Sequence, residues 1–220
     1  MKHCTLALAV LVPFFAQSHT EDHSPPGHIQ YVANKGQWPD QVRYRADLPG
    51  ASMFLEGNAI TWVRLEDGAS DKMHDLAHQP KAVQDAFQLN GHSWRVHFVG
   101  ADAAAQMGTE ERQTFYHNYF LGNDPAKWAG DVPVFHGVTY RQLWPGIDMR
   151  WHGEGGQVKY DVLLAPGADA SLIALSYEGL DGMRVDRDGN LKLTTSIGEM
   201  MEMKPVAWYA DDHEPLACAY

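Results

Sequence analysis

Short runs of alternating hydrophobic and polar residues dominate the chain after residue 41. In the clearest run, Trp94, Val96 and Phe98 point one way, and Arg95 and His97 point the other. Side chains on a β-strand alternate between its two faces, so this pattern predicts a strand buried on one face. We predict further strands at residues 42–45, 53–55, 59–65, 134–140, 147–152, 158–164, 172–177 and 191–195.

Turn signals separate these runs, for example Leu48-Pro49-Gly50 and Glu56-Gly57-Asn58. Frequent strands joined by turns predict an all-β fold, an antiparallel β-sandwich-like domain. Residues 66–90 are the exception, because they are polar with weak helical spacing. We expect them to form one short helical or loop insertion, which lies over the sheet or projects from it.

The clearest predicted hairpin spans residues 147–164. One alignment of its two strands places all the apolar side chains on the same face. A one-residue slip would put apolar and charged side chains on both faces, so this pattern specifies the register well. The predicted cross-strand pairs are Trp151 with Val158, Met149 with Tyr160 and Ile147 with Val162.

The other face of this hairpin is charged. In the predicted register Asp148 and Asp161 are directly opposed, at a separation near the roughly 5 Å between the carboxyl groups of a retaining glycosidase. Arg150 and Lys159 flank them, however, and would lower their pKa values, whereas a general acid needs a raised pKa. We therefore interpret them as diagonal ion pairs, Arg150 with Asp161 and Asp148 with Lys159, and a hydrolase stays the weakest functional alternative.

The chain begins with the features of a signal peptide. Lys2 precedes an apolar run at residues 6–15, and Ala16-Gln17-Ser18 offers a small-residue cleavage site. The run is too short to span a bilayer, so residues 1–18 predict export through the Sec pathway without membrane insertion after cleavage. Polar residues 19–30 read as a linker, and residues 31–220 as the all-β domain.

Charge and cysteine content limit the partners. Cleavage removes Lys2 and no acid, which changes the formal net charge from −11 to −12 and argues against nucleic acid and anionic membranes as partners. Cys218 is then the only thiol. Residues 206–209 read as a strand and 216–220 as the start of its return, so we expect the domain and a partner for Cys218 to continue beyond Tyr220.

Possible metal sites are weak in the sequence. His74 and His78 have the spacing of a zinc-protease helix, but Asp75 stands where that motif has glutamate, and Pro80 ends the helix. His19, His23 and His28 could hold a metal ion in a flexible tail, on composition alone. We predict no metal ligand and no cofactor.

Two further motifs favour turns and strands over chemistry. Residues 91–95 begin like a nucleophile elbow, but Arg95 replaces the final glycine and a strand follows where a helix is needed. Residues 186–190 resemble part of a calcium loop, although an Asp-Gly hairpin turn explains them more simply. We predict no catalytic residue.

Aromatic residues allow a binding function. The chain has seven Trp and nine Tyr residues, and exposed aromatic rings can stack on sugars, so a carbohydrate-binding domain is the main alternative. Packing is the simpler interpretation. It places Trp94 and Trp151 in the core and Trp38, Trp128 and Trp144 as plugs in loops.

The chain also resembles a known family across nearly all of its length after residue 30. The matching motifs are NKGQWP at residues 34–39, VHFVGA at 96–101, NYFLGNDP at 118–125, LWPGID at 143–148, KYD at 159–161, APGAD at 165–169 and DGNL at 188–191. These motifs are similar to those of the N-terminal domain that precedes SBBP (β-propeller-type) repeats and gliding-motility-associated segments in bacterial cell-surface proteins.

This resemblance implies an all-β, exported domain, often routed by the type IX secretion system, with no established catalytic residues. We therefore expect a non-enzymatic module of a secreted or cell-surface bacterial protein that serves adhesion or assembly. Its expected partners are surface polysaccharide or other cell-surface proteins.

Overall fold

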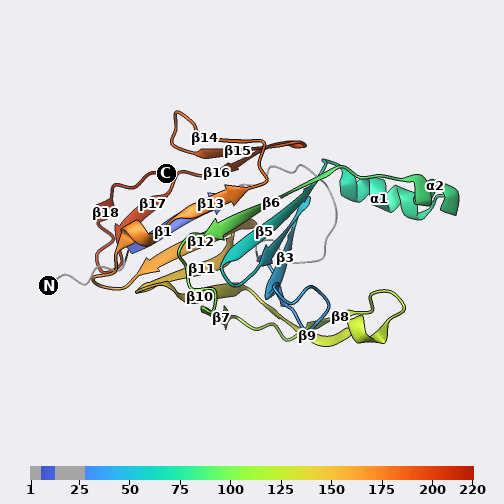
Figure 1. The fold of residues 1–220 in the computed structure, drawn as a ribbon, viewed down its shortest axis with the longest axis horizontal. Coiled ribbons are helices and arrows are strands. Elements are labelled where there is room, and N and C mark those ends of the chain that lie inside the picture. The colour runs from blue at the N-terminus through green and yellow to red at the C-terminus, as the bar shows by residue number, and fades with distance from the viewer. Residues whose placement is uncertain (1–5, 13–27) are drawn as a thin grey trace.

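Two large antiparallel sheets and one small sheet make up the fold. The structure is a computed structural model that describes residues 6–12 and 28–220. It is mostly strand with two short α-helices, so the predicted all-β, sandwich-like class is confirmed (Figure 1).

The first large sheet has, in spatial order, β18 (Pro215–Leu216), β17 (Val206–Tyr209), β1 (Leu6–Val12), β12 (Gln157–Leu164), β11 (Ile147–Glu154), β10 (Gly137–Trp144) and β7 (Gln106–Glu110). The second has β13 (Leu175–Glu178), β6 (Gly91–Phe98), β5 (Ala59–Leu65), β4 (Ala51–Leu55), β3 (Tyr44–Leu48), β2 (Tyr31–Ala33), β9 (Ala129–Phe135) and β8 (Tyr116–Tyr119). The small sheet has β14 (Gly182–Val185), β15 (Leu191–Thr195) and β16 (Gly198–Glu202).

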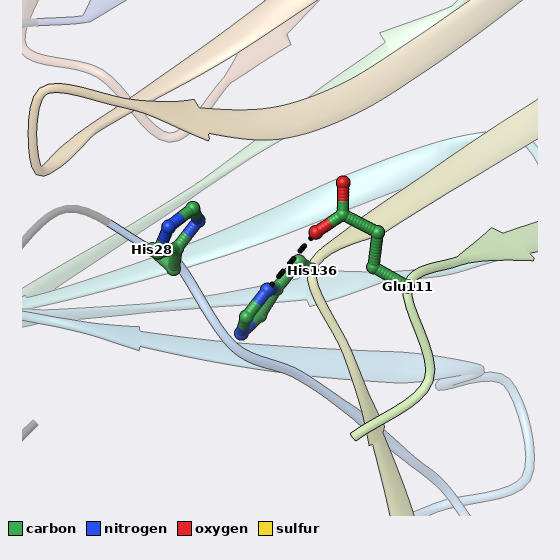
Figure 2. A group of neighbouring side chains, drawn as sticks. All are labelled: His28, Glu111 and His136. Carbon is green, nitrogen blue, oxygen red and sulfur yellow. Dashed lines mark hydrogen bonds and ion pairs between the residues drawn. The ribbon is translucent and has the colours of Figure 1, made fainter. Parts of the chain in front are cut away.

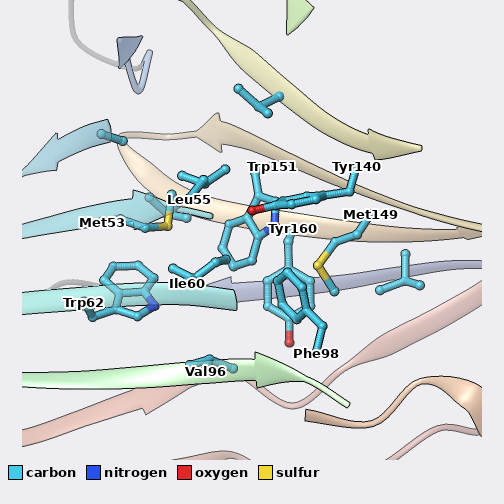
Figure 3. Packing of buried hydrophobic residues seen from close by; sticks show 14 of the residues in the cluster. Met53, Leu55, Ile60, Trp62, Val96, Phe98, Tyr140, Met149, Trp151 and Tyr160 are labelled. Carbon is cyan, nitrogen blue, oxygen red and sulfur yellow. The ribbon is translucent and has the colours of Figure 1, made fainter. Parts of the chain in front are cut away.

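The main hydrophobic core lies between the two large sheets (Figure 3). Trp94, Val96 and Phe98 are buried as predicted from their alternation. Trp94 also pairs directly with Trp62 on β5, and their rings stack with centroids 5.8 Å apart. Burial of such large side chains from both sheets is the dominant stabilising term in a fold of this kind.

The β11–β12 hairpin differs from its predicted register by two residues. Gly155 and Gly156, with φ of 59° and 79°, close a two-residue turn, so Glu154 pairs with Gln157 and Trp151 with Tyr160. Two adjacent positive-φ residues favour this tight turn, which sequence alternation alone does not specify. Because the shift is an even number of residues, the same apolar side chains still face the core.

The predicted strand at residues 134–140 is two strands in different sheets. β9 ends at Phe135, β10 begins at Gly137, and His136 lies at the crossing between the sheets. Apolar residues continue on both sides of His136, so no polar segment in the sequence marked the break.

The insertion at residues 66–90 forms two short helices, α1 (Ala69–Ala77) and α2 (Lys81–Ala86), which project from the sandwich (Figure 1). Glu66 at its base accepts hydrogen bonds from Lys72 and Asn90, both at 2.8 Å, and these bonds lower the pKa of the carboxyl. Two further 3₁₀ turns, η1 (Pro125–Lys127) and η2 (Ala170–Leu172), lie in loops.

Both ends of the described chain contribute to the first sheet. β1, which falls within the predicted signal peptide, pairs antiparallel with β12 and with β17. The other leader residues, 1–5 and 13–18, and linker residues 19–27 lie outside the described ones. No helix among the residues that are described is long and apolar enough to cross a membrane.

The predicted returning strand at residues 216–220 is shorter than expected, because only Pro215–Leu216 pairs with β17. Cys218 is a free thiol whose Sγ lies 3.2 Å from the carbonyl oxygen of Pro205. A disulfide partner for Cys218 stays a prediction.

Candidate functional site

The two aspartates considered for a hydrolase are not directly opposed in the β11–β12 hairpin. In the observed register Asp148 lies opposite Leu163, and Asp161 lies opposite Arg150, so the predicted direct opposition of the two carboxylates is wrong. Asp148 instead accepts a hydrogen bond of 2.7 Å from the backbone nitrogen of Gln142. The pair therefore lacks the direct opposition on which the comparison with a retaining glycosidase depended.

The charged face of the first sheet is an ion-pair network. Arg150 binds Glu110 of β7 through Nε at 3.0 Å and Nη2 at 2.7 Å, and these bonds lower the pKa of Glu110. Asp161 lies 3.7 Å from Arg150 Nη1 and 2.9 Å from His152 Nε2.

One of the two predicted diagonal ion pairs, Arg150 with Asp161, is present. The two residues are direct cross-strand partners rather than diagonal neighbours. The other is replaced by a 2.6 Å contact between Lys159 and Glu154.

The two motifs considered for metal binding remain simple surface features. His74 and His78 lie on and just after α1 with ring centroids 5.5 Å apart, and no third ligand from the described residues completes a group with them. Asp186 closes a turn, where it accepts hydrogen bonds from the backbone nitrogens of Asp188 and Asn190.

A different set of side chains has metal-ligand chemistry. His28, Glu111 and His136 lie side by side, and one potential ligand atom of each is within 4.8 Å of those of the other two (Figure 2). His136 Nδ1 is 3.3 Å from Glu111 Oε2. The ring of His28 stacks on that of His136, with centroids 4.6 Å apart and planes 11° apart.

Three separate chain segments hold this cluster. Glu111 directly follows β7 with φ of 51°, which turns the chain towards β8. His136 joins β9 to β10, and its backbone nitrogen donates to the carbonyl of Glu110 at 3.1 Å. His28 precedes Ile29, which is buried and packs against Gly153 of β11. The contact is close, because a Cβ atom added to Gly153 would lie 2.7 Å from the Ile29 nitrogen.

A second candidate is the aromatic tip of the β8–β9 hairpin, which we define as Phe120, Leu121 and Trp128. All three side chains are exposed, Phe120 at 69% and Trp128 at 44%. Phe120 and Trp128 meet edge to face with centroids 5.5 Å apart. Such a cluster of exposed apolar side chains marks an interaction surface more often than isolated ones do.

The aromatic tip is held in a fixed shape. Asp124 caps η1 by accepting from the nitrogen of Ala126 at 3.0 Å, and Trp128 Nε1 donates to the carbonyl of Gly122 at 3.2 Å. The base of the hairpin rests on a small second core of Val32, Ala129, Val132 and Val134, against which Trp38 and Tyr119 pack.

The predicted places of the tryptophans are corrected at two positions. Trp94 and Trp151 are buried in the core, and Trp38 packs on the second core. Trp144 is buried at the end of β10 rather than in a loop, and Trp128 is 44% exposed, although its Nε1 bonds across its loop to Gly122. The sequence did not identify the His28, Glu111 and His136 cluster either, because its members are far apart in the chain. The only hint of this cluster in the sequence was the group of histidines in the linker, which includes His28. The other two, His19 and His23, lie outside the described residues.

Comparison with known protein families matches residues 31–220 to one family, described as Domain of unknown function (DUF7948). No curated protein and no solved structure matches the chain.

Proposed function

We propose that this chain, which belongs to the DUF7948 family by its match over residues 31–220, is a non-enzymatic module of a secreted or cell-surface protein that serves adhesion or assembly. The signal-peptide pattern at residues 1–18 and the acidic composition support an exported protein that does not act on nucleic acid.

The observation that carries this proposal is the aromatic tip. Burying an exposed aromatic side chain in an interface contributes strongly to binding, and such residues are enriched among those that dominate interface energies. The hydrogen bonds of Trp128 and Asp124 already fix the tip, so binding there costs little ordering. A rigid apolar projection on a strongly acidic domain suits contact with another macromolecule.

Removal of the domain tests this function. Deletion of residues 31–220 in the producing cells should weaken their attachment to surfaces or to one another. Unchanged attachment would contradict the proposal.

Carbohydrate binding is the second candidate, and the exposed rings of Tyr116, Phe120 and Trp128 favour it. Flat aromatic faces stack on the apolar faces of sugar rings. The labelled protein should then bind members of a broad glycan panel, and Phe120→Ser should weaken that binding. Absence of binding across the panel would leave protein partners as the targets of adhesion.

A further inference from the structure

We propose that His28, Glu111 and His136 bind one divalent transition-metal ion, with Zn²⁺ as the best fit, and that this ion fastens the segment entering β2 to the corner where the two large sheets are connected. This goes beyond the proposed function, because the cluster is separate from the aromatic tip and serves the domain's own structure.

The donor set suits such an ion. Two imidazoles and one carboxylate are typical ligands of zinc, while calcium and magnesium prefer oxygen atoms alone. At ordinary Zn–N and Zn–O distances, two ligand atoms of a tetrahedral site lie about 3.3 Å apart. Nδ1 of His136 and Oε2 of Glu111 already have this separation, 3.3 Å.

The Glu111 carboxylate and Nδ1 of His136 face each other at 3.3 Å, so a proton or a cation has to lie between their lone pairs. Gln113 Nε2 is 3.2 Å from the same Nδ1, but it already donates to the carbonyl oxygen of Glu111 at 2.7 Å and does not depend on that lone pair. A metal ion would accept the lone pairs of Nδ1 and of the carboxylate together.

The third ligand needs a small rearrangement. A metal ion lies near the plane of each imidazole that binds it, so the nearly parallel stack of His28 on His136 cannot hold a shared ion as it stands. His28 is exposed, and its ring can turn while Ile29 stays in the core. Three protein ligands then leave a fourth position for water.

The arrangement gives the ion a structural role. Glu111 follows β7, His136 joins β9 to β10, and both segments cross between the two large sheets. His28 belongs to neither sheet. An ion held by all three would restrain the N-terminal segment and the crossing corner together, since binding only to the folded state stabilises it.

Calorimetric titration of the full chain with ZnCl₂ tests the proposal. We expect one strong site per chain, weakened about tenfold or more by each of His28→Gln, Glu111→Gln and His136→Gln. The matched controls are His74→Gln, on the exposed helix pair, and the double variant His19→Gln/His23→Gln, in the linker. Both should keep the site.

Thermal unfolding gives a second readout. Saturating Zn²⁺ should raise the melting temperature of the wild-type chain and of both controls, but not that of Glu111→Gln, a nearly isosteric change at an exposed side chain that should still fold. The proposal is overturned if no stoichiometric site appears, if Glu111→Gln binds like the wild type, or if either control loses the site.

Discussion

At the residue scale, Glu202 on β16 is a carboxyl group in an unusual environment. Its side chain is buried, and Tyr177 donates a hydrogen bond of 2.9 Å to its Oε1. Burial raises the pKa of this carboxyl from 4.5 to about 7, although the bond from Tyr177 works in the opposite direction. The folded chain therefore keeps a proton that the unfolded chain has already lost.

This difference predicts how stability depends on pH. As pH rises from 4.5 to about 7, Glu202 makes the free energy of unfolding fall, by at most about 3 kcal/mol. Glu202→Gln should remove that fall and stabilise the domain near pH 8, as measured by urea unfolding at about pH 5 and pH 8. Glu199→Gln, an exposed position on the same strand, is the control, and an unchanged pH dependence in Glu202→Gln would refute the account.

Gly153 provides a second residue-scale prediction. A Cβ there would lie 2.7 Å from the Ile29 nitrogen and 2.8 Å from its Cγ1, so Gly153→Ala should push the N-terminal segment away. We expect a loss of about 1–3 kcal/mol in the free energy of unfolding, as is typical of overpacking. Gly130→Ala is a matched control, since its Cβ would meet only Asn118 Oδ1 at 3.5 Å. Equal stabilities for the two variants would show that Ile29 is not fixed there.

At the element scale, the sequence predicted strands well where one face is buried. The alternation of Trp94, Val96 and Phe98 follows directly from the position of β6 between the core and solvent. The hairpin register failed by two residues because the apolar pattern repeats every two residues and cannot distinguish even shifts. The two-residue turn at Gly155 and Gly156 sets the register of the hairpin.

The candidate site was harder to predict for a different reason. Glu111 and His136 meet because neighbouring connections cross between the same two sheets, and this is a property of topology. His28 joins them only because Ile29 inserts beside Gly153. The local sequence around each of the three residues does not indicate that their side chains come together.

The helical insertion should be dispensable for folding. Glu66 and Asn90 already pair at its base, with Glu66 N donating to Asn90 O at 2.9 Å, so a short turn can connect β5 to β6. Replacement of residues 71–86 by Gly-Gly-Ser should change the free energy of unfolding by no more than about 1 kcal/mol, because these side chains are largely exposed. Loss of cooperative denaturant unfolding would show that α1 and α2 support the sandwich.

At the scale of the whole molecule, the projecting features share one end. Figure 1 shows the α1–α2 insertion and the β8–β9 hairpin at the end of the long axis opposite β17, β18 and the C-terminus. The sandwich thus separates the aromatic tip from the last strands of the chain. This arrangement supports a module that presents its tip outward, which is the central claim of the proposed function.

Binding of the fluorescently labelled protein to the surface of the cells that produce it tests this claim most directly. Phe120→Ser/Trp128→Ser should weaken saturable binding by at least about tenfold, as loss of dominant interface residues does. Met183→Ser, on β14 at a side chain 53% exposed, removes a similar apolar group away from the tip and should bind like the wild type. Equal binding by the tip variant and the wild type, or no saturable binding at all, would contradict the account.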